Sequence, residues 1–128
     1  MDSTMKLILI CDDVADNSFL LQTILSAESC QIEIVDSGAG ALTFIETNPC
    51  PPDLLILDVM MPRMNGFEVV QNIRQSTKFE FLPILLVTGF AEDDTQKALD
   101  IKIDGFIQKP IDPDAVITQV QTILKRNS

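Results

Sequence analysis

The sequence predicts one α/β domain in which a parallel sheet is covered by helices on both faces. Five strand-like runs alternate with five helical runs along the chain, which is the order of a doubly wound sheet. Three of the strand-like runs are continuously apolar, as expected of strands buried on both faces. The chain has 128 residues, of which 46% are hydrophobic, so it can form one core and not two. We therefore expect a single domain over residues 1–128.

The five expected strands share short apolar or alternating patterns, each ended by a polar residue. They are residues 6–11, 31–35, 54–57, 83–87 and 105–108. The first, third and fourth are apolar throughout. The second alternates polar and β-branched residues, which is typical of a strand with one exposed face. Aspartates end the first and third strands, and Thr88 with Gly89 ends the fourth.

The expected helices follow each strand and share apolar residues at helical spacing. The first expected helix ends at about residue 29 and the second ends before Pro49. The third begins after Gly66, the fourth covers about residues 95–101 and the fifth covers about residues 113–125. The first helix presents Phe19, Leu20, Ile24 and Leu25 at that spacing, with Asp16 or Asn17 as its N-cap. The last begins at an Asp112 cap with proline at the first helical position, which pre-sets the helical φ.

Composition excludes several classes of function. Nineteen acidic and nine basic residues give a net charge of −10, which repels a phosphate backbone and argues against direct nucleic-acid binding. No apolar run approaches the roughly 20 residues of a membrane span, and residues 1–4 lack the basic stretch of a secretory signal. We therefore expect a soluble, cytoplasmic protein without membrane insertion.

Histidine is absent from the chain, and the cysteines follow no metal-binding or disulfide pattern. The absence of histidine excludes Ser-His and Cys-His nucleophile pairs, histidine metal sites and a histidine phosphocarrier. Cys11, Cys30 and Cys50 are an odd number at unrelated spacings, so we expect buried, reduced thiols. Cys11 is interpreted as a strand residue rather than a redox group.

Polar residues stand at the carboxyl ends of four expected strands. Asp12 and Asp13 follow the first strand, Asp58 the third, Thr88 the fourth and Lys109 the fifth. The carboxyl ends of parallel strands meet at one edge of the sheet, where ligands of such folds bind. Each residue alone is an ordinary capping or loop residue, but their joint occurrence predicts a site at this edge.

The residue types at this edge favour phosphoryl transfer. Two carboxylates about 4 Å apart near a protein surface repel by ~4 kcal/mol, so such a cluster takes up protons or binds a cation. Oxygen ligands without sulfur or imidazole suit Mg²⁺. A metal ion, a lysine and a threonine hydroxyl beside a carboxylate can stabilise a transferring phosphoryl group, with Asp58 as the nucleophile. The sequence has no Walker lysine loop and no complete GxGxxG motif, so we interpret the glycines of residues 38–40 as residues that pack or cap a helix.

Four motifs resemble the receiver domain of bacterial two-component response regulators, and in particular the chemotaxis regulators. They are Asp12-Asp13, the segment DVMMPRMNG at 58–66, Thr88-Gly89 and the segment FIQKP at 106–110. The resemblance covers essentially the whole chain. It implies a flavodoxin-like (βα)5 fold with strand order 2-1-3-4-5.

The resemblance also implies a role for each acidic residue. Asp58 would accept a phosphoryl group from a sensor histidine kinase or a histidine-containing phosphotransfer protein. Mg²⁺, with Mn²⁺ as an alternative, would be held by Asp13, Asp58 and the main-chain carbonyl of Met60, and Asp12 would act mainly through water. The domain would be regulatory rather than an enzyme, with only self-catalysed phosphoryl transfer and slow autodephosphorylation.

A switch and an output face are implied as well. Lys109 would contact the phosphoryl group, and the Lys109–Pro110 bond would be cis, which costs an X-Pro bond only ~0.5–1 kcal/mol. Thr88 would move toward the phosphoryl group and Phe106 would follow, which changes the face built from the fourth helix, fifth strand and fifth helix. That face would contact a downstream protein, in a monomer or a weak dimer that depends on phosphorylation.

Three positions depart from the family pattern. Met60 and Phe90 are apolar where polar side chains in relatives orient the hydrolytic water, which predicts a long-lived acyl phosphate. Lys102 stands where relatives commonly have a glycine that ends the fourth helix. Either Lys102 is left-handed, at a cost of ~1 kcal/mol, or that helix ends differently.

Other functions stay open at this point. The chain is either a single-domain regulator or the receiver of a longer protein such as a hybrid kinase. A receiver-like binding module that works without phosphorylation is one alternative. An aspartate-dependent phosphatase of the haloacid dehalogenase type is another, but its general acid would fall at Met60, which cannot transfer protons.

Overall fold

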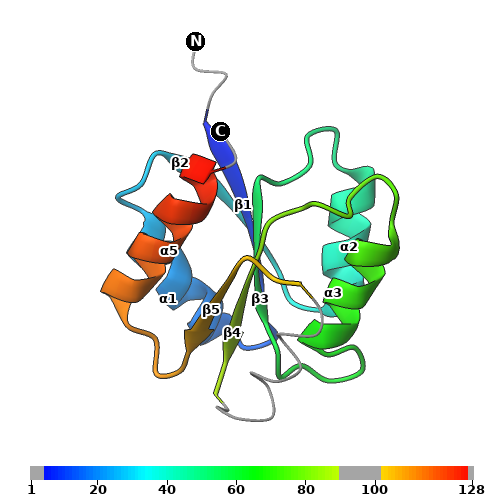
Figure 1. Ribbon diagram of the computed structural model, residues 1–128. Helices are drawn as coiled ribbons and strands as arrows, with labels where there is room; N and C mark the ends of the chain where they lie inside the picture. Colours follow the sequence, from blue (N-terminus) through cyan, green and yellow to red (C-terminus); the bar gives the residue numbers. More distant parts are fainter. Residues whose placement is uncertain (1–4, 90–101, 127–128) are drawn as a thin grey trace.

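The computed structural model describes residues 5–89 and 102–126 and shows a sheet between two layers of helices (Figure 1). The strands are β1 (Lys6–Cys11), β2 (Cys30–Val35), β3 (Leu54–Asp58), β4 (Ile84–Thr88) and β5 (Gly105–Gln108). The helices are α1 (Ala15–Leu25), α2 (Gly38–Thr47), α3 (Gly66–Gln75) and α5 (Pro113–Arg126). The helix expected over 95–101 lies outside the described residues. Among the described helices, none combines the length and the apolar content needed to cross a bilayer.

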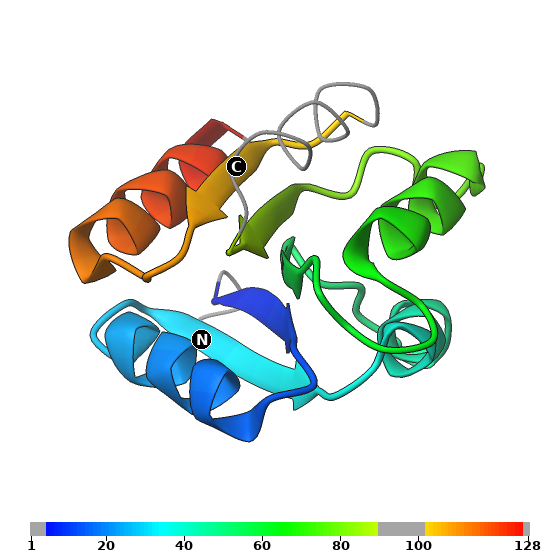
Figure 2. The same ribbon diagram turned by 90° about the horizontal axis from the view of Figure 1, so that it is seen from below.

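The five strands form one parallel sheet in the order β2-β1-β3-β4-β5. The expected fold class and strand order are therefore confirmed. The helices α1 and α5 cover one face of the sheet, and α2 and α3 cover the other (Figure 2). This arrangement follows from right-handed crossovers on both sides of the switch point between β1 and β3.

Alternate residues of the central strands supply two cores, one on each face. Leu9, Leu55 and Leu57 pack with α2 and α3, whereas Ile8 and Ile56 pack with α1 and α5. All five residues are essentially inaccessible to solvent. β1, β3 and β4 are buried on both faces, which explains why their sequences are apolar except for Lys6 at the start of β1 and for Asp58 and Thr88 at the ends of β3 and β4. Exposed and half-buried residues occupy the edge strand β2, which explains its mixed sequence.

The buried face of α1 differs from the prediction. Phe19 is 68% exposed and Leu20 is 42% exposed, whereas Ser18, Leu21 and Leu25 form the buried stripe. The helix ends at Leu25, earlier than residue 29. The expected apolar face was therefore wrong for its first two residues, because spacing alone cannot tell which of two overlapping stripes faces the core.

The N-cap expected for α1 was also wrong. The helix begins at Ala15, so Asp16 and Asn17 lie in its first turn, and its N-cap residue Val14 makes no side-chain cap hydrogen bond. Instead, Oδ1 of Asp12 accepts a hydrogen bond from the N–H of Val14 at 2.9 Å. This bond turns the chain immediately after the strand and starts the helix earlier than the sequence suggested.

Helices α2, α3 and α5 begin with clear caps. The Ser37 hydroxyl accepts a hydrogen bond from the N–H of Gly40, and Asn65 forms a capping box with Glu68. Asp112 accepts from the N–H of Asp114, which confirms the expected cap of α5. These caps fix where the helices start relative to the strand ends.

Candidate acidic site

The carboxyl ends of β1, β3, β4 and β5 bring the predicted residues together at one edge of the sheet. One carboxylate oxygen from each of Asp12, Asp13 and Asp58 lies within 4.8 Å of the others. The Nζ atom of Lys109 lies 3.2 Å from Oδ1 of Asp58. Thr88 ends β4 next to them and is wholly buried.

The loop after β3 is held close to the sheet. The N–H of Val59 donates to the carbonyl of Val87, and the N–H of Gly66 donates to the carbonyl of Val59, both at 2.9 Å. A Cβ atom on Gly66 would lie 2.6 Å from the carbonyl oxygen of Asp58. Gly66 is therefore required for the close approach of α3 to the end of β3. The sequence singled out Gly66 as the start of a helix and as the last residue of the segment at 58–66, but not for this close contact.

The electrostatics of Asp58 are those of a buried and crowded carboxylate. Desolvation by burial, followed by repulsion from Asp12, raises the pKa of Asp58 from its ordinary 3.8 to about 6. The Lys109 ammonium and a hydrogen bond from the Met60 main chain oppose this rise in pKa. Burial also raises the pKa of Asp12. The site therefore holds more negative charge than its single lysine balances.

The side chain of Asn17 supports Asp12. Its hydrogen bond to the Asp12 carboxylate lowers the pKa of that group, against the larger effect of burial. The sequence identified Asn17 only as a candidate N-cap. Its place in the first turn of α1, a few residues after the end of β1, brings it to Asp12.

The residues of this edge fit a divalent cation. Oδ1 of Asp58 is buried and has no hydrogen-bond partner among the described residues, and the Lys109 ammonium forms an ion pair with it at 3.2 Å. Asp12 and Asp13 add two further carboxylates within reach of one ion. Oxygen-only donors of this kind suit Mg²⁺ or Mn²⁺.

The residues expected to form the switch, Thr88 and Phe106, lie on the neighbouring strands β4 and β5. Phe106 is half-buried on β5 and packs against the core on the α2 and α3 face. Its main chain is held by Gln119 of α5, whose side-chain amide accepts from the N–H of Phe106 at 3.1 Å and donates to its carbonyl at 2.8 Å. No sequence pattern indicated Gln119. Just beyond this strand, the Lys109–Pro110 peptide bond is cis.

The structure decides two smaller points. Lys102 has a φ of 49°, so it is left-handed, which is the first of the two outcomes that the sequence left open. Phe90 lies outside the described residues.

The cysteines differ in burial. Cys11 is buried, donates its thiol hydrogen to the carbonyl of Ser37, and lies 3.7 Å from the sulfur of Met61. Burial and the nearby aspartates raise the pKa of Cys11 to about 12, so its thiol stays protonated and unreactive at neutral pH. The expectation of buried thiols was wrong for Cys50, which is exposed, and Cys30 is only half-buried.

The fold and its acidic edge together define the class of response regulator receiver domains. The chain belongs to this family, because the family model matches residues 8–121. Receiver domains are the regulatory domains of two-component signalling, in which they interact with histidine kinases.

Similar curated proteins come from several bacteria. The chain is 36% identical over 115 residues to an uncharacterised 14.6 kDa protein of Leptolyngbya boryana, covering 89% of this chain and 86% of that protein. It is 34% identical over 120 residues to the regulatory protein VanRc of Enterococcus gallinarum, covering 93% of this chain but 50% of that protein. The chain thus spans about half the length of most of the curated relatives it matches.

Solved structures with the same fold include receivers from different kinds of protein. The receiver domain of a histidine kinase from Syntrophus aciditrophicus has a TM-score of 0.86 and 29% identity, covering 94% of this chain and 91% of that one. The Mn²⁺-bound form of the response regulator Rcp1 has a TM-score of 0.78 and 25% identity, covering 92% of this chain and 91% of that one.

Proposed function

We propose that this domain accepts a phosphoryl group on Asp58 from a histidine of a sensor kinase or a phosphotransfer protein. A carboxylate oxygen of Asp58 attacks the phosphorus, the bond from phosphorus to the histidine nitrogen breaks, and the electron pair stays on that nitrogen, which takes up a proton. The observation that carries this proposal is the Asp58 carboxylate itself. It lies in an acidic cluster with an ammonium 3.2 Å away, and one of its oxygens has no hydrogen bond from the described residues.

A divalent cation completes the proposed site. Asp12, Asp13, Asp58 and the main-chain carbonyl of Met60 would hold Mg²⁺, with Mn²⁺ as an alternative. When bound, the ion neutralises negative charge on the carboxylates and on the phosphoryl oxygens. The Mn²⁺-bound form of Rcp1 supports this choice of metal.

The remaining residues of the edge have roles that their positions support. Lys109, already paired with Asp58, binds a phosphoryl oxygen once the acyl phosphate has formed. The Thr88 hydroxyl donates a hydrogen bond to another phosphoryl oxygen, and the side chain of Phe106 moves with it. Because Gln119 ties the Phe106 main chain to α5, this movement changes a protein-binding face that includes β5 and α5.

The acyl phosphate is proposed to be long-lived. The Met60 side chain is 53% exposed beside Asp58 and carries no group that can orient a hydrolytic water. Replacing Met60 by asparagine and Phe90 by glutamate should shorten the half-life several-fold. A matched control is Met5→Asn, which changes a methionine of similar exposure, 52%, immediately before β1. An unchanged half-life in the double variant would contradict the proposal.

The cellular setting follows from the same proposal. The domain would work in the cytoplasm, as a single-domain regulator or as the receiver of a longer protein. It would act as a monomer or a weak dimer that depends on phosphorylation, and its output would be contact with a downstream protein rather than with DNA.

The test is intact-mass measurement after incubation with acetyl phosphate and Mg²⁺. We expect one added phosphoryl group that disappears with a chelator and in Asp58→Asn, but is kept in Asp16→Asn, which removes a neighbouring acid outside the cluster. If no adduct forms, binding of beryllofluoride should be measured on the same sample. Failure to bind it as well would favour a module that works without phosphorylation.

A further inference from the structure

We propose that Arg63, in the loop between β3 and α3, binds the phosphoryl group of an incoming phosphodonor and holds it near Asp58 before transfer. The inference rests on the proposed function and adds a residue that recognises the donor. Arg63 is exposed and stands five positions after Asp58. The sequence included it only within the segment at 58–66.

The loop that carries Arg63 folds back onto the end of β3. The N–H of Gly66 donates to the carbonyl of Val59 at 2.9 Å, and a Cβ atom on Gly66 would lie 2.6 Å from the Asp58 carbonyl oxygen. Arg63 precedes Gly66 by three residues, and three residues span at most about 11 Å even when fully extended. The Arg63 main chain is therefore confined to the surroundings of Asp58, where a long and flexible side chain can reach an incoming donor.

The backbone at Arg63 favours glycine, although arginine occupies the position. The φ of Arg63 is 68°, in the left-handed region, and the N–H of Met64 donates across it to the carbonyl of Pro62 at 2.7 Å. A hydrogen bond across one residue with this φ is typical of the rare and strained form of the γ-turn. Strained residues of this kind occur where the side chain has a function. The turn leaves the Arg63 side chain exposed to solvent.

Among the described residues, Arg63 and Lys109 are the cations on the loops of the carboxyl edge, the edge of the sheet that holds the acidic site. Lys109 is paired with Asp58, whereas neither ion pair within the described residues includes Arg63. The carboxylate of Glu68, at the start of α3, is engaged in the capping box. The aspartates at the strand ends and in the helical turns that follow them are Asp12, Asp13, Asp16, Asp36, Asp58, Asp112 and Asp114.

This excess of carboxylates opposes the approach of a phosphodonor, because the donor is an anion. Arg63 does not make the edge cationic, but it lowers the repulsion where the donor arrives. Its guanidinium also offers paired N–H donors that match the oxygens of a phosphoryl group. Removing Arg63 should therefore have opposite effects on two kinds of ligand. An anionic donor should bind less well, and a cation should bind better.

The variant Arg63→Gly tests both effects, and it also relieves the strained backbone. At saturating Mg²⁺ and low ionic strength, we expect phosphorylation by acetyl phosphate, followed by intact mass, to slow about three- to fivefold. Calorimetric titration should show that the affinity for Mg²⁺ rises about twofold. The slowing should shrink at high ionic strength, where salt screens the charge. Arg63→Lys keeps the charge and should recover most of the rate.

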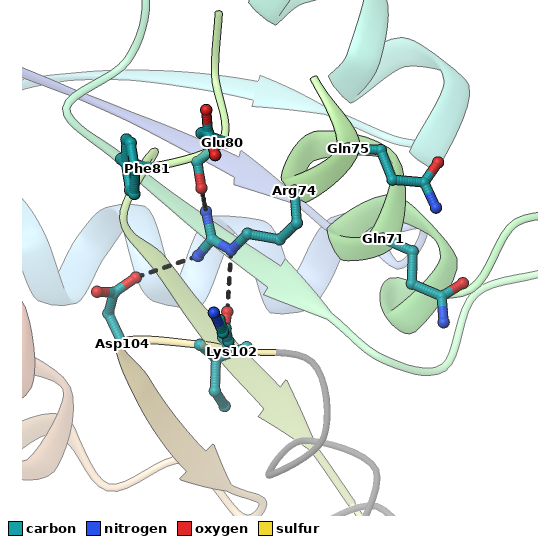
Figure 3. Close-up of a pocket in the computed structure, with 8 residues that line it drawn as sticks. Gln71, Arg74, Gln75, Glu80, Phe81, Lys102 and Asp104 are labelled. Atoms are coloured by element: carbon teal, nitrogen blue, oxygen red, sulfur yellow. Dashed lines mark hydrogen bonds and ion pairs between the residues drawn. The ribbon is translucent and has the colours of Figure 1, made fainter. Parts of the chain in front are cut away.

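Lys102→Gly is the matched control. Lys102 is also a left-handed cation, with a φ of 49°. It lies before β5, at the amino edge of the sheet, where β1 begins and α5 ends at the top of Figure 1. There its carbonyl accepts from Arg74 at 3.0 Å (Figure 3). The control removes the same charge and the same kind of strain away from Asp58, so the phosphorylation rate and the Mg²⁺ affinity should stay close to those of the wild type.

Three outcomes would overturn the proposal. The first is an unchanged phosphorylation rate in Arg63→Gly at low ionic strength. The second is a loss of both the rate and the Mg²⁺ affinity, which would give Arg63 a structural role in the loop. The third is equal slowing in Lys102→Gly, which would assign the effect to net charge. If the wild type itself is not phosphorylated, the proposed function fails, and this inference fails with it.

Discussion

The two edges of the sheet use aspartate in opposite ways. At the amino edge, the carboxylates of Asp53 and Asp104 each accept a hydrogen bond of 2.8 Å, from the N–H groups of Leu7 and Ile84. At the carboxyl edge, one buried oxygen of Asp58 receives no hydrogen bond from the described residues, and two further carboxylates lie close to it. Asp12 at the carboxyl edge also accepts a main-chain hydrogen bond, from the N–H of Val14, so the contrast lies in the crowding of three carboxylates and in the one Asp58 oxygen that is left without a hydrogen bond.

The amino edge gives the largest expected loss of stability. Arg74→Met removes the donor to three main-chain carbonyls and the partner of Asp104. We expect the free energy of unfolding to fall by roughly 3 kcal/mol, measured by urea denaturation, because partly buried polar groups lose their bonds. Mg²⁺ should still raise the free energy of unfolding of the Arg74→Met variant, because the acidic site lies at the other edge of the sheet. The control is Gln71→Met, a change at an exposed position of the same helix. If Arg74→Met lowers the free energy of unfolding no more than Gln71→Met does, the hydrogen bonds of Arg74 do not stabilise this edge.

The carboxyl edge gives an expected gain of stability when the metal is absent. The folded protein disfavours ionised Asp58, whose pKa is raised from 3.8 to about 6. Stability from this group is therefore full below pH 3.8 and is lost as the pH rises through about 6. In a chelator at pH 8, Asp58→Asn should be more stable than the wild type by about 2 to 3 kcal/mol at most.

The pH dependence separates this effect from a general effect of the substitution. The difference in unfolding free energy between the two proteins should shrink between pH 8 and pH 5, and Mg²⁺ should stabilise only the wild type. If Asp58→Asn were less stable at pH 8 in the chelator, the crowding of negative charge would not be the dominant feature of this edge.

A smaller effect is expected where α3 approaches β3. Gly66→Ala places a methyl group 2.6 Å from the Asp58 carbonyl oxygen, so the loop must shift. We expect a loss of about 1 to 3 kcal/mol and slower phosphorylation of Asp58. Gly89→Ala is the matched control, because a Cβ atom added to Gly89 would have no atom of the described residues within 4 Å. Equal behaviour of the two variants would rule out a packing role for Gly66.

The smallest effect is a gain at the amino edge. Lys102 is left-handed, with a φ of 49°, so Lys102→Gly should stabilise the protein by up to about 1 kcal/mol. Lys102→Ala removes the same side chain but keeps the backbone penalty, and should give no gain. A gain in both variants would assign the effect to the lysine charge rather than to the backbone.

Much of the fold could be predicted because the central strands are long apolar runs, and a polar residue of the site stands at or directly after the end of each. The face of α1 could not, because Phe19 and Leu20 are exposed although they share the spacing of core residues. The hydrogen bonds of Arg74 could not be predicted either, because their acceptors are main-chain carbonyls, which leave no pattern in the sequence. The placement of Asp58 with Lys109 followed from strand order, whereas the support from Gln119 depends on how α5 packs against β5.

Calorimetric titration with Mg²⁺ tests the comparison of the two edges most directly. The account predicts binding of one ion to the wild type, loss of binding in Asp13→Asn and Asp58→Asn, and unchanged binding in Asp53→Asn, which alters a carboxylate of the amino edge. Binding that survives in Asp58→Asn, or that is lost in Asp53→Asn, would contradict the assignment of the metal site to the carboxyl edge.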